Sequence, residues 1–142
     1  MNIYGTTEEI KKYLISEAVK SGSGLKGFSV EDNPYIPLEI RVPFILLEGI
    51  ESAVAAGGDG YPCEYFHSIE ASVVVSGSEE NILQFRIKAA EAAEEVIRLL
   101  AVLRDYRMKI TPKEMTAGEL MIGSLKCTGM KIVFEVRTLF TE

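Results

Sequence analysis

The sequence predicts an α+β fold, in which two helices pack on one face of a mixed or antiparallel sheet to form a two-layer sandwich. Two segments carry apolar residues at helical spacing, and several others alternate apolar and polar residues with the period of a strand. The expected order is α-β-β-α-β-β, with a further β possible near the end. The chain of 142 residues fits a single domain, 1–142, and its 47% apolar content is ordinary for a globular protein.

The first helix is expected over residues 7–20. Its apolar residues at helical spacing are Ile10, Tyr13, Leu14, Ala18 and Val19. Thr6 and Glu9 have the spacing of a capping box, in which each side chain bonds the backbone N–H of the other residue. The glycine-rich run 21–24 then ends the helix. A short extended piece fits the residues around 28–30.

Two strands are expected between the helices. The first covers 38–47, where an alternating pattern leads into a continuous apolar run. Pro43 lacks an N–H donor and therefore marks an edge, a bulge or a break. Residues 49–62 are small and rich in glycine, and are expected to form a long connection. The second strand, over 63–75, shows the longest alternation in the chain.

The second helix is expected over 79–104. Ser78 is a favourable N-cap residue, and Glu79 and Glu80 in the first turn suit the positive end of the helix dipole. The apolar arc of this segment is wider than an ordinary amphipathic stripe. We therefore expect it to be the main core helix.

The C-terminal part of the chain is expected to be extended. A short strand over 108–111 would end at Pro112, and a second piece fits 119–126. The pair Thr128-Gly129 is typical of a turn. The last strand is expected from 131 to 140, where apolar and polar residues again alternate.

The sequence carries no motif of a familiar catalytic or cofactor site, so we expect no enzyme activity, no catalytic residues and no cofactor. Cys63 and His67 have the spacing of zinc ligands on a helix, but on a strand this spacing separates them by about 13 Å. With only 1 histidine in the chain, no metal site is expected. Cys63 and Cys127 are expected to be free thiols.

Charge and hydropathy limit the expected partners. The net charge is -6, and 11 of the 21 acidic residues but only 5 of the 15 basic ones lie in residues 1–71. An acidic chain gains no counterion-release affinity for nucleic acid, so neither direct DNA binding nor binding to anionic membranes is expected. The asymmetry suits electrostatic matching between subunits. With no secretion signal and no long apolar run, we expect the chain in the cytoplasm or in a particle assembled there.

The candidate functional residues lie in the glycine-rich loop and in the strand that follows it. A phosphate cradle would need a helix start after the glycines, whereas a strand follows here. We expect either an assembly loop that becomes ordered against a partner, or a plain mobile connection. The candidate interface residues are Gly57, Gly58, Asp59, Gly60, Tyr61, Tyr65 and His67.

The order of the segments forms a pattern along most of the chain. An N-terminal helix is followed by the strand Ile-Pro-Leu-Glu-Ile-Arg-Val-Pro, a glycine-rich loop and a long alternating strand. That strand runs into Ser-Gly-Ser-Glu-Glu-Asn and an alanine-rich helix, and the strand Lys-Ile-Val-Phe-Glu-Val-Arg comes last. This pattern resembles the tail terminator and tail-completion (neck) proteins of long-tailed phages. Segment 105–130 is an addition relative to the shorter members of that family.

The resemblance implies a structural virion protein of a phage or prophage, without catalytic residues. Such a subunit would form a homo-oligomer, a hexameric ring, that caps the tail tube and then joins the tail to the head. Its partners would be copies of itself, the tail tube protein and the head connector protein. It would be found in the virion tail or neck after assembly in the host cytoplasm.

Two alternatives remain open from the sequence. The first is a small ligand- or peptide-binding regulatory module that uses the sheet face opposite the helices, around Tyr65 and His67. The second is an enzyme with an unfamiliar site.

Overall fold

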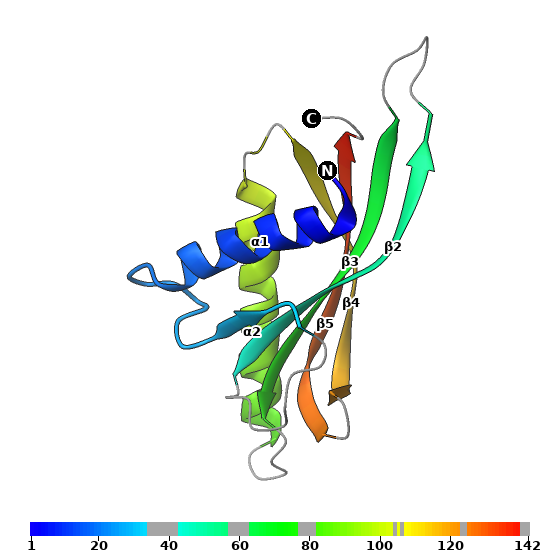
Figure 1. Ribbon diagram of the computed structural model, residues 1–142. Helices are drawn as coiled ribbons and strands as arrows, with labels where there is room; N and C mark the ends of the chain where they lie inside the picture. Colours follow the sequence, from blue (N-terminus) through cyan, green and yellow to red (C-terminus); the bar gives the residue numbers. More distant parts are fainter. Residues whose placement is uncertain are drawn as a thin grey trace.

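The computed structural model describes residues 1–33, 43–56, 63–76, 82–103, 105, 107–122 and 125–139. The element order is α1 (Ile3–Ala18), β1 (Ser29–Glu31), β2 (Phe44–Ala55), β3 (Glu64–Ser76), α2 (Ile82–Val102), β4 (Met108–Ile122) and β5 (Leu125–Leu139). Both helices lie on the same face of one five-stranded sheet (Figure 1). The expected α+β fold class is therefore confirmed, with β1 as a third strand before α2.

Helix α1 begins four residues earlier than expected, and the capping box is not formed. Asn2 is the N-cap, and its side-chain oxygen accepts a hydrogen bond of 2.8 Å from the Gly5 N–H. Thr6 lies inside the helix, where its hydroxyl donates to the Asn2 carbonyl oxygen at 2.8 Å. The helix ends at Ala18. The asparagine cap is locally favourable, and the Thr6 hydroxyl that bonds back to Asn2 is not available as a cap, so the helix starts before the predicted position.

The sheet has the strand order β1-β2-β3-β5-β4, in which only β1 and β2 are parallel. Strand β1 pairs with Phe44–Leu46 alone, directly after Pro43, whose carbonyl oxygen accepts from the Ser29 N–H at 3.3 Å. Strand β3 is central and agrees with the strand expected over 63–75. The predicted strand residues 38–42 lie outside the described residues.

The long connection expected over 49–62 is wrong for residues 49–55, which continue β2 as a strand. These residues pair with the first half of β3, and a bulge lies between Gly49 and Glu51. The bulge breaks the alternation of period two, and small exposed residues follow it, so the strand pattern is lost in the sequence.

The C-terminal prediction of two separate pieces and a turn is also wrong. Strand β4 runs through Pro112 without ending, because Pro112 sits on an edge strand next to a bulge before Glu114. Thr128 and Gly129 are paired residues of β5 and form no turn. For α2, the described part agrees with the expected helix, and residues 77–81 and 104 lie outside the described residues.

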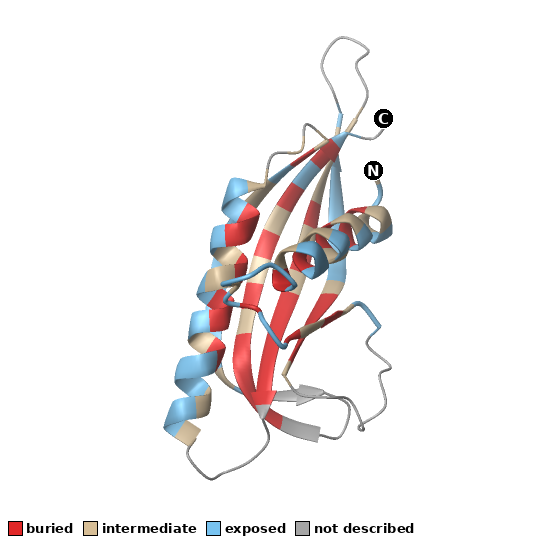
Figure 2. Cartoon of the chain, turned by 90° about the vertical axis from the view of Figure 1, so that its left-hand side faces the viewer, coloured by how far each residue is buried: buried red, intermediate tan, exposed pale blue. Residues whose placement is uncertain are grey.

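One hydrophobic core lies between the helices and the sheet (Figure 2). Its largest fully buried side chains include Ile10 and Leu14 of α1, Ile45 and Leu47 of β2, and Phe134 of β5. Helix α2 contributes small residues, such as Ala89, Ala92 and Ala93, which let it approach the sheet closely. The Tyr13 hydroxyl donates to the Leu99 carbonyl oxygen at 2.8 Å and joins the two helices.

Candidate assembly interface

Five of the predicted interface residues, Gly57, Gly58, Asp59, Gly60 and Tyr61, lie outside the described residues. The other two, Tyr65 and His67, are brought together on β3. Their rings stack with centroids 4.8 Å apart, because alternate residues of a strand point to the same face. That face carries the core residues Ile69, Ala71 and Val73 and is therefore the one covered by the helices. The expectation that Tyr65 and His67 lie opposite the helices is wrong.

His67 is fully buried at the centre of a polar network that ties the N-terminus to three strands. Its Nδ1 atom lies 2.7 Å from the Ser52 hydroxyl of β2. Its Nε2 atom lies 2.9 Å from the Met1 carbonyl oxygen and 3.1 Å from the Thr138 hydroxyl of β5. Thr138 also donates to the Met1 carbonyl oxygen at 2.8 Å. The Met1 ammonium donates to the Leu139 carbonyl oxygen.

The partners of His67 decide its protonation. A carbonyl oxygen only accepts, so Nε2 carries the proton and donates to Met1, while Nδ1 accepts from the Ser52 hydroxyl. Burial lowers the pKa of His67 below its usual 6.5, in spite of the raising effect of the bond to Met1. The ring is therefore neutral at pH 7. A closed, neutral and fully bonded histidine holds α1 on the sheet and does not present a group to a ligand.

The opposite face of the sheet carries ion pairs between strands. Arg137 of β5 forms a forked pair with Glu64 of β3, with Nη2 at 2.6 Å and 2.8 Å from the two carboxylate oxygens. The guanidinium also lies over the ring of Phe66, 5.6 Å from its centroid. Lys131 pairs with Glu70 at 3.6 Å. The charges of Glu64, Glu70, Lys131 and Arg137 on this face are therefore paired with one another.

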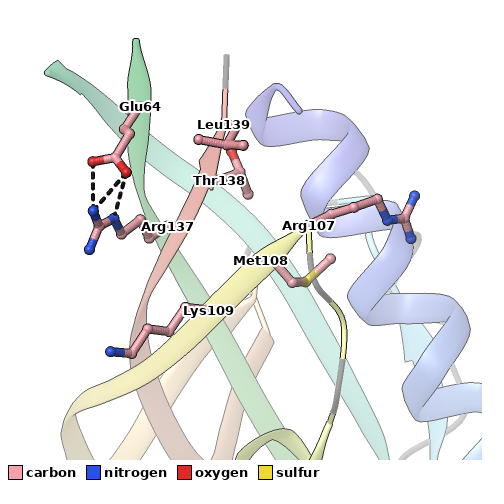
Figure 3. A pocket seen from close by; sticks show the side chains of 7 residues that line it. All are labelled: Glu64, Arg107, Met108, Lys109, Arg137, Thr138 and Leu139. Carbon is pink, nitrogen blue, oxygen red and sulfur yellow. Dashed lines mark hydrogen bonds and ion pairs between the residues drawn. The ribbon is translucent and has the colours of Figure 1, made fainter. Parts of the chain in front are cut away.

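A shallow pocket lies at the end of the sheet where β3, β4 and β5 meet, with a volume of about 280 Å³. Figure 3 shows that Lys109 and Arg137 point to one side of the sheet and Arg107 to the other. Arg107 bonds Asp105 at 2.9 Å and Glu9 of α1 at 3.3 Å. The arginine holds the pKa of the Asp105 carboxyl below its usual value. These pairs fix the start of β4 against α1.

An apolar groove lies beside the opposite end of β4, with a volume of about 410 Å³. It is lined by Arg86, Ile87 and Ala90 of α2, Ala117 and Gly118 of β4, and Gly129 and Met130 of β5. Gly118 and Gly129 are register partners, and a Cβ added at Gly118 would meet open space. Ile87 is 50% exposed and the nearby Leu83 is 67% exposed, so the groove is open to solvent. We name these seven lining residues the α2–β4 groove.

A second exposed apolar surface lies at the other edge of the sheet. Tyr4 of α1 is 81% exposed, and Ile50 and Val54 of β2 are 50% and 55% exposed. Beside them Glu48 and Glu51 make no ion pair with a described residue. We name these five residues the β2-edge surface.

Strands β2 and β4 leave backbone groups open over the described ranges. Strand β1 covers only Phe44–Leu46, so β2 from Leu47 to Ala55 has no described strand neighbour on its outer side. Strand β4 has no described strand neighbour on its outer side along its whole length. Open edges are natural sites for pairing with another chain. Sequence reasoning missed these two surfaces because the edge position of a strand depends on the order of strands in the sheet.

No group of three His, Cys, Asp or Glu side chains in the described part of the chain has the arrangement to hold a metal ion. No described helix is long and apolar enough to cross a bilayer.

Comparison with known proteins gives a likeness at the level of structure. No family model matches the sequence, and no curated protein matches it. A chain in the solved structure of the virion of a native gene transfer agent (GTA) particle superposes with a TM-score of 0.56 at 15% identity. The match covers 92% of this chain and 91% of that one. The two chains share a fold.

Proposed function

We propose that this chain is a structural protein of a phage-type virion and, more specifically, a tail terminator or head–tail joining subunit. The observation that carries the proposal is the whole-length fold likeness to a chain of a gene transfer agent virion. Fold alone does not define function. The resemblance of the sequence pattern to tail terminator and neck proteins is an independent argument in the same direction.

The surfaces of the molecule support an assembly role. An assembling subunit needs exposed apolar patches and open strand edges. The described part of the structure offers both at the α2–β4 groove and at the β2-edge surface, which lie toward opposite edges of the sheet. The one histidine is enclosed with both ring nitrogens bonded, so the group best suited to acid–base chemistry at neutral pH is used for structure.

The proposed form is a hexameric ring that caps the tail tube and then receives the head connector. A ring through which DNA passes must not retain the DNA, and an acidic chain with a net charge of -6 repels phosphate. Ring closure requires heterologous contacts, in which one surface of each subunit meets a different surface of the next.

Light scattering coupled to size exclusion, followed by negative-stain imaging, tests this form. We expect a mass of six chains of 15.7 kDa each and images of a ring with a central hole. A strict monomer at high protein concentration would overturn the ring. In a particle-producing strain, removal of the gene should leave tails of irregular length that are not joined to heads, because an uncapped tube continues to polymerise. Normal joined particles would overturn the tail terminator role.

A further inference from the structure

We propose that copies of this chain associate head to tail, with the β2-edge surface of one subunit seated in the α2–β4 groove of the next. The inference rests on the proposed assembly function and names the contact through which the subunits of the ring meet. Its occupant is a second copy of the same chain.

The two surfaces are placed for such a contact. In the strand order β1-β2-β3-β5-β4, the open part of β2 and the groove beside β4 lie toward opposite edges of one sheet. A subunit therefore presents both halves of the contact at once. Two different surfaces on opposite edges generate a closed ring or an open filament, whereas one self-complementary surface would stop at a dimer.

The shapes and chemistry of the surfaces are complementary. The groove is mostly apolar and glycines form part of its lining, so it has room for branched side chains from outside. The β2-edge surface offers such side chains in Ile50 and Val54, both at least half exposed. Covering the exposed part of these apolar side chains in the groove would favour association through the hydrophobic effect.

The charges of the two surfaces are opposite. Arg86 lies on the groove, is exposed and makes no ion pair with a described residue. Glu48 and Glu51 flank the apolar residues of the β2 edge and are likewise not paired with a described residue. Opposite charges at the rim of an interface guide the correct approach and disfavour contacts between like surfaces. Groove-to-groove contact would bring arginines together, and edge-to-edge contact would bring glutamates together.

The register of the sheet also fixes how the strands would lie in the ring. Ser52 is level with His67, Val136 and Ile110, whereas the groove is at Ala117 on β4. Because the bulge in β4 adds one residue, the two surfaces are offset along the strands by six residue pairs, roughly 20 Å, and the three strand spacings from β2 to β4 separate them by about 14 Å across the sheet. Closing a flat ring through this contact requires the strands to be inclined to the ring axis by about 55°, somewhat more than the tilt of about 35–45° found in closed β-barrels.

Paired variants of the full chain test the contact. Ile87→Glu with Ala117→Glu places charge in the groove, and Ile50→Lys with Val54→Lys places charge on the edge. All four positions are exposed, so we expect both variants to keep the wild-type circular dichroism spectrum and cooperative unfolding. Val19→Glu is the matched control, since Val19 is 82% exposed and belongs to neither surface.

We expect each double variant alone to be monomeric, with a dissociation constant for self-association raised at least about tenfold, and the control to assemble normally. Mixing the two variants should give a 1:1 dimer, because one intact groove and one intact edge remain. In addition, Arg86→Glu should weaken assembly, and adding Glu48→Arg with Glu51→Arg should restore it.

Three results would overturn the head-to-tail contact. Both double variants could assemble like wild type, the edge variant could assemble while the groove variant does not, or the mixture could remain monomeric. In the first two cases the oligomer would persist, so the proposed assembly function would stand while this contact would not. A wild-type chain that never self-associates would instead contradict the ring itself.

Discussion

The Nε2 atom of His67 lies 2.9 Å from the carbonyl oxygen of Met1, so the first residue of the chain is bonded to the central strand of the sheet. The bond joins residues 66 positions apart. Ser52 and Thr138 complete the network from the two neighbouring strands. These hydrogen bonds hold Met1 on the sheet, and they thereby fix the position from which α1 begins to cross the sheet.

Replacing His67 should destabilise the protein substantially. His67→Ala leaves the Met1 carbonyl oxygen without its histidine donor and opens a cavity in a fully buried site. We expect the free energy of unfolding to fall by about 2–4 kcal/mol. Urea unfolding followed by circular dichroism measures it. Ser52→Ala is the milder comparison, since it removes only the hydrogen bond to Nδ1 of His67 and opens no cavity, and it should cost about 1 kcal/mol. Equal small losses for both variants would contradict the central role of the histidine.

The free energy of unfolding should fall as the pH drops below 6.5, the usual pKa of a histidine side chain. Burial lowers the pKa of His67 in the folded protein below 6.5, so the unfolded chain binds more protons over the interval between the two pKa values. The contribution is fully present above pH 6.5 and is lost progressively as the pH falls toward the folded pKa. Urea titrations at pH 7.5, 6.5 and 5.5 should show this decline, and His67→Gln should remove the part due to the histidine. An identical decline in both proteins would rule out His67 as its source.

Gly49 should not tolerate a side chain, because α1 lies directly on it. A Cβ at this position would be 2.6 Å from Cγ1 of Ile3. We expect Gly49→Ala to lower the free energy of unfolding by about 1–3 kcal/mol through overpacking. In an Ile3→Ala background the same change should cost much less, because the clashing atoms are gone. A double-mutant cycle by urea unfolding measures the coupling, and additive effects would show that the contact is absent.

The two thiols should differ in reactivity. Cys127 is buried, and burial raises the pKa of its thiol, whereas Cys63 is partly exposed. The reactive species is the thiolate, so Cys127 should be slow to react with Ellman's reagent in the native state. We expect 1 fast thiol in the native protein and 2 after unfolding in urea. Cys63→Ser should abolish the fast phase, and a fast phase that survives this change would contradict the assignment.

Elements with strong local patterns could be predicted from the sequence. The alternation in β3 continues over several residue pairs, and the amphipathic pattern of α2 continues over several turns. Both patterns are long enough for their period to identify the element. The C-terminal part of β2 and most of the middle of β4 are not predicted as strand, and the reason is shared. Each contains a bulge, and at edge positions they expose both faces in part, so neither keeps a regular alternation.

The candidate site was only partly predictable. Tyr65 and His67 were recognised as unusual polar and aromatic residues on a strand, but the sequence does not show that Met1 lies above them. That contact depends on where α1 crosses the sheet. The two proposed assembly surfaces were missed for a similar reason, since Ile87 and Ala117 come together only when α2 and β4 pack side by side.

The sequence by itself determined the fold class and the acidic balance of the chain, because periodicity and composition are local or additive properties. Only the tertiary structure decided which strands are edges, which face His67 occupies and where apolar side chains remain uncovered. Those properties arise from contacts between segments far apart in the chain, and no local pattern encodes the order in which strands pair.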